Sequence, residues 1–200
     1  YKRQKLGIAR TFQNIRLWKS MTVFENVLVA KHMRAKQNVF SATFRGNAKE
    51  EKRMRDETMA LLVEQGLEKY KDDIATSLPY GIQRRLEIAR ALATNMKLLL
   101  LDEHTAALDP VTADKVLALT RSVVSERSIS CLMITHNMHQ ALELGTRTLM
   151  MDAGRIVLDV SGPERAGMTV QGLLDAFAAK AGATFDNDRV LLSTAEDPEN

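Results

Sequence analysis

An unbroken apolar run followed by two carboxylates constrains the fold of this chain more than any other feature. Leu98–Leu101 is a stretch of four leucines, with Lys97 before it and Asp102 and Glu103 after it. A run of this kind between charges is typical of a parallel strand that is covered on both faces. Ligands of open α/β sheets bind at the carboxyl ends of the strands. Asp102 and Glu103 are therefore candidates for a functional site, with an ordinary acidic turn as the alternative.

Length and composition indicate one globular domain. The chain has 200 residues, of which 45% are hydrophobic and 26% charged. No run approaches the roughly 20 apolar residues that cross a bilayer, and no signal peptide opens the sequence, so we expect membrane association only through a partner. The single cysteine, Cys131, excludes an internal disulfide and fits a reducing compartment. Because it lies in an apolar run, we expect a small buried side chain rather than a reactive thiol.

The net charge of +3 is unevenly distributed. Residues 31–56 carry eight Lys or Arg against three Asp or Glu, a local charge of +5, which leaves −2 for the rest of the chain. A basic stretch can bind nucleic acid or anionic lipid, or can be a solvated face. Its two aromatic residues, Phe40 and Phe44, form no stacking pattern, so we interpret it as a solvated face.

The spacing of apolar residues predicts alternating strands and helices. Thr22 and Glu25 form a capping-box pattern, so a helix is expected to begin at Val23 and run to about Arg34. The remaining predicted elements are strands at 6–12, 98–101 and 130–135, helices at 48–65, 81–94 and 111–126, a short helix ending at 144, and a hairpin of 146–151 with 155–160. Residues 13–20 and 38–47 are expected to be loops, and the acidic C-terminal residues a frayed tail. This order predicts an α/β fold.

Five short motifs occur in order along the chain. They are Gln13 in RTFQNIRL, LPYGIQRRLEIARAL at 78–92, LLLLDEH, Ala107-Leu108-Asp109, and His136 in MITHNM. Together they resemble the ATPase subunits of ABC transporters. The resemblance implies a P-loop NTPase-like α/β core with a mostly parallel sheet. It implies a single, N-terminally truncated ABC ATPase domain over 1–200, divided into an α-helical subdomain at 23–78, a catalytic core with the signature helix at 79–160, and a C-terminal helix and tail at 161–200.

The resemblance also implies a role for each matched residue. Asp102 would hold Mg²⁺ through water, and Glu103 would polarise the attacking water. His136 would contact the γ-phosphate of ATP and orient Glu103. Gln13 would lie in a loop that senses both Mg²⁺ and the membrane partner. Asp109 would lie in the loop that crosses the interface with a second ATPase subunit.

The segment 78–83 would be the signature loop, which opens a helix toward the ATP of that second subunit. Free N–H groups at a helix start favour an anion, and Gly81 lets the backbone approach it. Pro79, Tyr80, Gly81 and Gln83 are the implied nucleotide-binding residues. The sequence departs from the family in Pro79, where Ser is usual, and in Ile82, where Gln is usual, so a hydroxyl contact to phosphate is lost. Pro before a helix and Gly at its start are also ordinary helix punctuation.

One motif of the family is missing from the sequence. A phosphate-binding loop needs G-x-x-x-x-G-K-[ST], and none of the ten glycines is followed by Lys. The chain begins with Tyr1 rather than Met, so we expect this loop to lie upstream and the chain by itself to bind ATP weakly or not at all. His104 stands where most of the family has Pro, which we expect to alter only the stiffness of the turn. His32 and His139 lack partners at ligand spacing, so nucleotide-bound Mg²⁺ is the only metal expected.

The implied function is that of the ATP-hydrolysing subunit of a bacterial ABC importer, with ATP and Mg²⁺ as cofactors. Residues 5–92 resemble the ATPases of branched-chain amino-acid importers, whereas DEHTAALDP, THNMHQAL and RTLMMDAGRIVLDVSG resemble another subgroup of binding-protein-dependent importers. The implied partners are transmembrane permease subunits, a second identical or different ATPase subunit and, indirectly, a periplasmic substrate-binding protein. The implied location is peripheral, at the cytoplasmic face of the inner membrane.

Two other functions remain open at this point. A soluble, non-transport ABC ATPase of DNA repair or translation would need paired cassettes or coiled-coil insertions, and the sequence has neither repeats nor heptads. We therefore expect no nucleic-acid partner. A non-catalytic interaction module would not need Asp102, Glu103 and His136 together.

Overall fold

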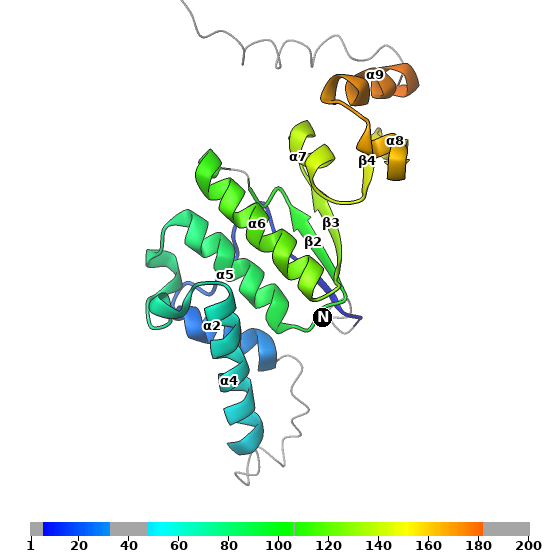
Figure 1. Cartoon of the computed structure of the whole chain (residues 1–200). Helices are drawn as coiled ribbons and strands as arrows, with labels where there is room; N and C mark the ends of the chain where they lie inside the picture. The colour runs from blue at the N-terminus through cyan, green and yellow to red at the C-terminus, as the bar shows by residue number, and fades with distance from the viewer. Residues whose placement is uncertain (1–5, 33–47, 106, 182–200) are drawn as a thin grey trace, which may run out of the picture. The chain divides into compact units, whose positions relative to one another are not determined.

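The computed structural model describes residues 6–32, 48–105 and 107–181, which fall into two compact units, 1–134 and 135–200 (Figure 1). Most of the basic stretch, the predicted loop at 38–47 and the C-terminal tail lie outside the described residues. The elements in chain order are β1 (Ile8–Arg10), α2 (Val23–His32), α4 (Ala48–Glu64), the 3-10 turns η1 (Glu68–Tyr70) and η2 (Ala75–Ser77), α5 (Tyr80–Ala93), β2 (Leu98–Asp102), α6 (Pro110–Glu126), β3 (Ser130–Ile134), α7 (Met138–Glu143), β4 (Arg147–Asp152), β5 (Arg155–Ser161), α8 (Gly162–Ala166) and α9 (Val170–Ala181).

The first unit is built on a parallel sheet in the order β1-β2-β3. β2 is central, and its Leu98 pairs with Ile8 on one side and with Ser130 on the other. Parallel neighbours require long crossover connections. The segment from α2 to α5 makes the first crossover and α6 makes the second. The predicted fold class, α/β with a parallel sheet and a helical region, is therefore confirmed.

The central strand is buried on one face only. Leu99 and Leu101 are 0% and 1% exposed, whereas Leu98 and Leu100 on the opposite face are half-buried. The expectation that both faces would be covered is therefore wrong for one of them. A run of four leucines predicts the strand, but it cannot tell which face another layer covers, because both faces are equally apolar.

The strand predicted at 130–135 is present, but the prediction that it is buried is wrong. β3 ends at Ile134, and Leu132 and Ile134 are 48% and 49% exposed. Cys131, which we expected to be buried, is exposed as well. The reason is position: among the described residues β3 pairs with β2 alone and stands at the edge of the sheet. Edge strands receive packing contacts from fewer neighbours than central strands do.

Capping residues determine where α2 and α6 begin. Glu25 N–H donates to Thr22 Oγ1 at 3.2 Å, and Thr22 N–H donates to Glu25 Oε2 at 2.8 Å, so the predicted capping box is confirmed. At α6, Thr112 N–H donates to Asp109 Oδ1 at 3.0 Å and Pro110 occupies the first helical position. Both are standard helix-start residues, and α6 begins one residue earlier than predicted.

Helix α5 organises the core of the first unit. It contacts α2, α4, α6 and β1, and Figure 1 shows it running between α6 on one side and α2 and α4 on the other. Leu86, Ile88 and Leu92 of α5 are at most 2% exposed and join one apolar cluster with the buried face of β2. The amino-terminal end of α5 is thereby fixed relative to the end of β2, where the two carboxylates lie.

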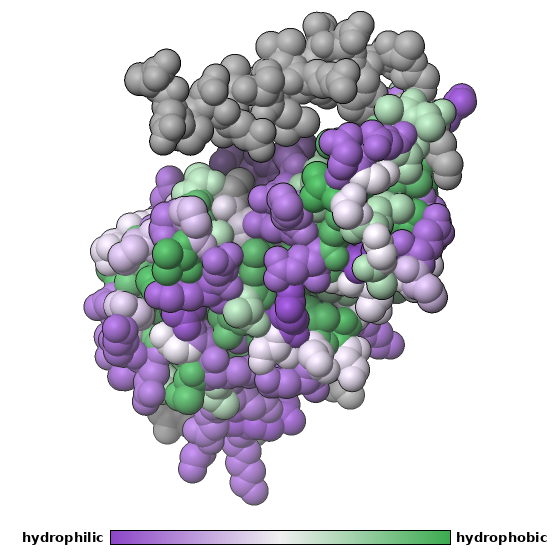
Figure 2. Space-filling model, turned by 45° about the horizontal axis from the view of Figure 1, so that its top comes forward, coloured by the Kyte–Doolittle hydropathy of each residue, from purple (hydrophilic) through white to green (hydrophobic). Residues whose placement is uncertain are grey.

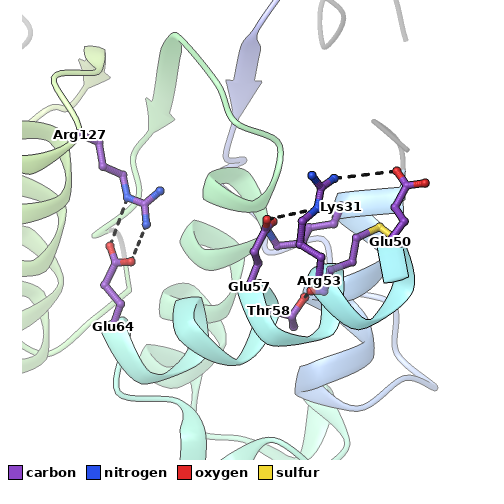
Figure 3. Close-up of polar contacts among 8 residues, drawn as sticks. Lys31, Glu50, Arg53, Glu57, Thr58, Glu64 and Arg127 are labelled. Carbon is purple, nitrogen blue, oxygen red and sulfur yellow. Dashed lines mark hydrogen bonds and ion pairs between the residues drawn. The ribbon is translucent and has the colours of Figure 1, made fainter. Parts of the chain in front are cut away.

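Polar residues link α2, α4 and α6 at the surface (Figure 3). Lys31 Nζ lies 2.7 Å from Glu57 Oε2, and this hydrogen bond lowers the pKa of Glu57. Arg127 Nη2 lies 2.5 Å from Glu64 Oε2. These four residues, which we call the α4 ion-pair cluster, line a cavity of about 270 Å³. Because each cation there already faces a carboxylate, the cavity offers no excess charge to a ligand.

The surface around these helices is largely polar. Figure 2 shows hydrophilic side chains over much of the visible face, with hydrophobic ones in smaller groups between them. In α4 the buried residues are Met54, Thr58, Leu61 and Leu62, so most of its 17 residues face solvent, as its mostly polar sequence predicts. Within the described part of the chain, no helix is both long and apolar enough to cross a membrane.

The second unit contains the predicted hairpin. β4 and β5 are antiparallel, and the turn residues Ala153 and Gly154 have φ of 45° and 77°. Two left-handed residues in a two-residue loop match the twist of the flanking strands. Leu158 and Val160 of β5 pack against Leu173 of α9. These contacts give the unit an apolar cluster of its own.

Candidate functional site

Strand β2 brings Asp102 and Glu103 to the carboxyl edge of the sheet. Asp102 is the last residue of the strand, and the next backbone N–H, that of Glu103, donates to Ile134 O at 3.0 Å. Glu103 has φ of 42°, in the left-handed region that residues with a Cβ rarely adopt. Such a conformation costs about 1–3 kcal/mol and is often found at functional sites. Four other described residues that are not glycine also have positive φ, among them Ala153 in the hairpin turn, so this conformation alone does not identify a functional residue.

Residues from β1 and the loop after it contact both carboxylates. Gln13 Nε2 donates to Glu103 Oε2 at 2.9 Å, so two predicted site residues far apart in the sequence lie together. Arg10 Nη2 lies 2.5 Å from Asp102 Oδ2. Sequence reasoning missed Arg10, because only the register of β1 on β2, in which Arg10 pairs with Leu100, places it at this edge.

Asp102 is the carboxylate for which the sequence predicts a magnesium ion that shares its ligands with a nucleotide. Among the described residues, no group of three or more His, Cys, Asp or Glu is placed to hold a metal ion. A metal cage made of such side chains is therefore not formed by them. Mg²⁺ commonly takes one or two carboxylates and completes its shell with water and phosphate oxygens. Arg10 already occupies Oδ2 of Asp102, so this mode of metal binding at Asp102 stays a prediction.

The predicted signature segment begins α5, and its side chains are engaged within the chain. Pro79 is the N-cap of the helix, without a side-chain cap. Gln83 Nε2 donates to Leu78 O at 2.8 Å, which fixes the loop before the helix. Tyr80 OH accepts from Arg84 Nη2 at 2.9 Å. The backbone N–H groups at the start of α5 remain the part of this segment that suits an anion.

Gly81 is needed for packing. A Cβ added at Gly81 would collide with Cγ2 of Thr112 in α6. The glycine therefore allows α5 and α6 to approach closely near their amino-terminal ends, a reason that the sequence motif does not reveal. Close approach to a phosphate remains a prediction.

Arg84 and Glu87 of α5 are charged, yet both are buried. Arg84 is 0% exposed and Glu87 5%. Arg84 Nη1 lies 2.6 Å from Glu87 Oε2. Burial raises the pKa of Glu87, while the Arg84 charge and the N–H of Phe12 oppose that rise. Helical spacing places Arg84 one turn before the apolar Ile88, but this spacing does not by itself distinguish a buried charge from an exposed one.

His104, the residue after Glu103, is 1% exposed. Its Nε2 has no hydrogen-bond partner among the described residues. Burial, with a smaller effect from the Arg84 charge, lowers the pKa of His104 to about 4. His104 is therefore neutral at physiological pH and buried.

Two further predicted site residues lie elsewhere. Asp109 caps α6, and the hydrogen bonds that Asp109 forms with Thr112 lower its pKa. His136 belongs to the second unit, between β3 and Asn137, the N-cap of α7. The catalytic role of His136 stays a prediction.

The parallel sheet and the carboxylates at its edge define an open α/β protein, a class whose ligands bind at the carboxyl ends of the strands. Within that class, the chain belongs to the ABC transporter family, whose sequence profile matches residues 1–106.

Curated relatives agree with this assignment. The chain is 35% identical over 161 residues to the high-affinity branched-chain amino acid transport ATP-binding protein BraF of Pseudomonas aeruginosa, covering 80% of this chain and 63% of that protein. It is 36% identical over 189 residues to a tyrosine transport ATP-binding protein of Clostridioides difficile, covering 88% of this chain and 68% of the relative. The chain therefore spans about two thirds of the length of these relatives.

Solved structures share the fold. An ATP-binding cassette of an ABC transporter in its ADP conformation superposes with a TM-score of 0.69 at 25% identity, covering 98% of this chain and 71% of that one. A dimeric cassette in a post-hydrolysis state, bound to ADP and Pi, gives a TM-score of 0.62 at 26% identity, covering 77% and 62%.

Proposed function

We propose that this chain belongs to the ATP-binding and ATP-hydrolysing subunit of an ABC importer for amino acids. The observation that carries the proposal is the contact of Gln13 with Glu103, beside Asp102, at the carboxyl edge of the sheet. A carboxylate oriented by a neighbouring amide suits general-base activation of water. The names of the relatives, which are transport proteins for branched-chain amino acids and tyrosine, support amino acids as the transported class.

In this proposal each residue has one task. Bound Mg²⁺ and ATP would supply the phosphoryl group and the positive charge that neutralises its oxygens. Asp102 would hold the metal, with Gln13 as a second polar group. Glu103 accepts a hydrogen bond from the attacking water and takes its proton, which contributes roughly 10²- to 10⁴-fold in rate. For His136, contact with the γ-phosphate stays the role that the family resemblance implies.

The signature segment and Asp109 would act at the interface with a second ATPase subunit, identical or different. Backbone N–H groups at the start of α5, with Pro79, Tyr80, Gly81 and Gln83, would face the ATP of that subunit. Gln83 would act by shaping the loop, since its side chain already holds Leu78 O. The solved dimeric cassette, 26% identical to this chain, supports a paired arrangement.

The same proposal assigns a different role to each part of the chain. Residues 23–78 would contact the transmembrane permease subunits, residues 79–160 would form the catalytic core, and residues 161–200 would add a C-terminal helix and tail. A periplasmic substrate-binding protein would deliver the amino acid to the permease. The subunit would lie at the cytoplasmic face of the membrane and attach to it through the permease.

A chimaera tests the proposal. The sequence lacks the G-x-x-x-x-G-K-[ST] loop, so we expect the chain by itself to bind ATP weakly or not at all. Placing before Tyr1 the segment that precedes the matched region in BraF should confer Mg²⁺-dependent ATP binding and hydrolysis. In that chimaera, Glu103→Gln should retain ATP binding and lower kcat by roughly 10²-fold or more.

Unchanged kcat in the Glu103→Gln chimaera would remove Glu103 from its role. Absence of ATP binding in a folded wild-type chimaera, checked by its unfolding transition, would argue against the whole proposal.

A further inference from the structure

We infer that Arg84 is a positioning residue for this site, which holds the Gln13 side chain against Glu103 through the backbone of Phe12 and Gln13. The importance of Arg84 for catalysis rests on the proposed function, but the contacts of Arg84 can be tested without a nucleotide. Arg84 and Glu87 of α5, with Phe12 and Gln13 of the loop after β1, form what we call the Arg84 network.

The network fixes three consecutive backbone groups of the loop. Arg84 Nη1 donates to Phe12 O at 2.6 Å, and Arg84 Nη2 donates to Gln13 O at 2.8 Å. Phe12 N–H donates to Glu87 Oε1 at 3.2 Å. The side chain of Gln13 then reaches Glu103 Oε2 at 2.9 Å. Contacts therefore run without interruption from α5 to the carboxylate.

The cost of burying this pair points to orientation rather than stability. The Arg84 and Glu87 side chains are 0% and 6% exposed. Buried ion pairs are seldom more stable than apolar residues of the same size, because both charges lose their water. Here the two terminal nitrogens of the guanidinium donate to the backbone of a segment without regular structure, while Arg84 Nε has no hydrogen-bond partner among the described residues. The pair therefore replaces the backbone partners that a sheet or helix would provide.

The shape of arginine matters in this position. Its planar fork reaches Phe12 O and Gln13 O with different nitrogens, which the single ammonium of Lys cannot reproduce. Arg84 Nη2 also donates to Tyr80 OH at 2.9 Å, in the first turn of α5. Arg84 thus links the signature segment to Gln13, so a displacement at the start of α5 is transmitted to the residue that orients Glu103.

The test measures the Gln13 side chain directly, in the 200-residue chain and without ATP. The solvent-exchange rate of the Gln13 side-chain amide protons is followed by ¹⁵N NMR in four variants. Glu103→Ala gives the rate without the acceptor. Arg84→Met/Glu87→Met replaces the buried pair by apolar residues, Arg84→Lys retains the charge without the fork, and Glu64→Gln/Arg127→Met removes an ion pair of the α4 cluster as the matched control.

We expect the double Met variant to raise the exchange rate about tenfold, toward that of Glu103→Ala, the size expected for losing a hydrogen bond to a charged group. Arg84→Lys should raise it by a smaller factor, and the α4 control should leave it unchanged. A wild-type rate in folded Arg84→Lys and double Met variants would overturn the inference. If the double variant does not fold, a wild-type rate in Arg84→Lys is sufficient to overturn it.

The chimaera described above gives the kinetic counterpart. Because Arg84 acts on Glu103 through Gln13, Arg84→Lys should lower kcat by a larger factor than it raises the KM for ATP. A raised KM with unchanged kcat would contradict the positioning role. If the wild-type chimaera hydrolyses no ATP, the proposed function fails, while the NMR result still decides whether Arg84 holds Gln13.

Discussion

Two groups of ion pairs in the first unit differ in their burial and in the groups that they contact. In the Arg84 network the ion pair of Arg84 and Glu87 is buried, and the guanidinium reaches the backbone of the loop beside Glu103. In the α4 ion-pair cluster the Glu64 and Arg127 side chains are 29% and 37% exposed and contact each other. Water screens the second pair and hardly reaches the first. Similar contacts can therefore fix a backbone in one place and add little in another.

The largest expected effect comes from breaking the buried pair on one side only. Arg84→Met should lower the free energy of unfolding by about 3–5 kcal/mol, because Glu87 would be left as a buried, unpaired carboxylate. Urea unfolding at pH 7.5 measures the change. The double variant Arg84→Met/Glu87→Met should recover most of the loss. A loss of less than about 1 kcal/mol in the single variant would show that the pair resembles the exposed pairs of the α4 cluster.

The two regions should also differ in the pH at which they begin to lose stability. The pKa of His104, beside the Arg84 network, is lowered from 6.5 to about 4, so between these values the unfolded chain binds a proton that the folded chain does not. Stability should therefore fall as the pH drops from 6.5 to 4, by about 3 kcal/mol from this residue. Comparing the wild type with His104→Leu at several pH values isolates the effect.

In the α4 ion-pair cluster, acid should reduce the stability only at a lower pH than it does through His104. The Lys31 hydrogen bond lowers the pKa of Glu57 from 4.5, so its contribution is present above pH 4.5 and is lost below it. Glu57→Gln should therefore behave like the wild type in its pH dependence from 6.5 to 5. If His104→Leu retained the full slope in that window, His104 would not be its source.

A smaller effect is expected for Lys31→Met. Lys31 is 8% exposed, while its partner Glu57 is 48% exposed. Met retains the packing of the aliphatic stem, so only the ion pair is lost, at a cost of about 0.5–1 kcal/mol. Urea unfolding beside Lys31→Ala, which also loses the stem, separates charge from packing. Equal losses in the two variants would assign no stability to the stem.

The smallest effect is expected for Arg127→Met, at most about 1 kcal/mol. High salt should make the difference in the free energy of unfolding between this variant and the wild type smaller still. The reason is that dissolved ions screen the attraction between two exposed charges. A loss of several kcal/mol that persists in 1 M salt would contradict the distinction between the two regions.

Much of the fold could be read from local pattern. The capping box at Thr22 and Glu25, the four leucines and the hairpin around Gly154 each depend on residues close in sequence, and all three are confirmed as elements. Burial was predicted less well. Leu132 and Ile134 are as apolar as the leucines of β2, but their exposure depends on the place of β3 in the sheet.

The candidate site divides in the same way. Asp102, Glu103 and Gln13 follow from motifs, and the structure brings Gln13 and Glu103 into contact. Arg10 and Arg84 were missed because their partners lie about 70 to 90 residues away, across strand register and helix packing. A motif records residue types and spacing along the chain, but not these contacts across it.

The sequence by itself determined the family, the order of strands and helices, and the two carboxylates at the end of β2, because each depends on residue types at short spacing. Only the tertiary structure decided that Arg84 and Glu87 are buried and that they hold the loop of Gln13. Burial of a charge depends on all the elements packed around it, and its cost is offset by partners distant in sequence.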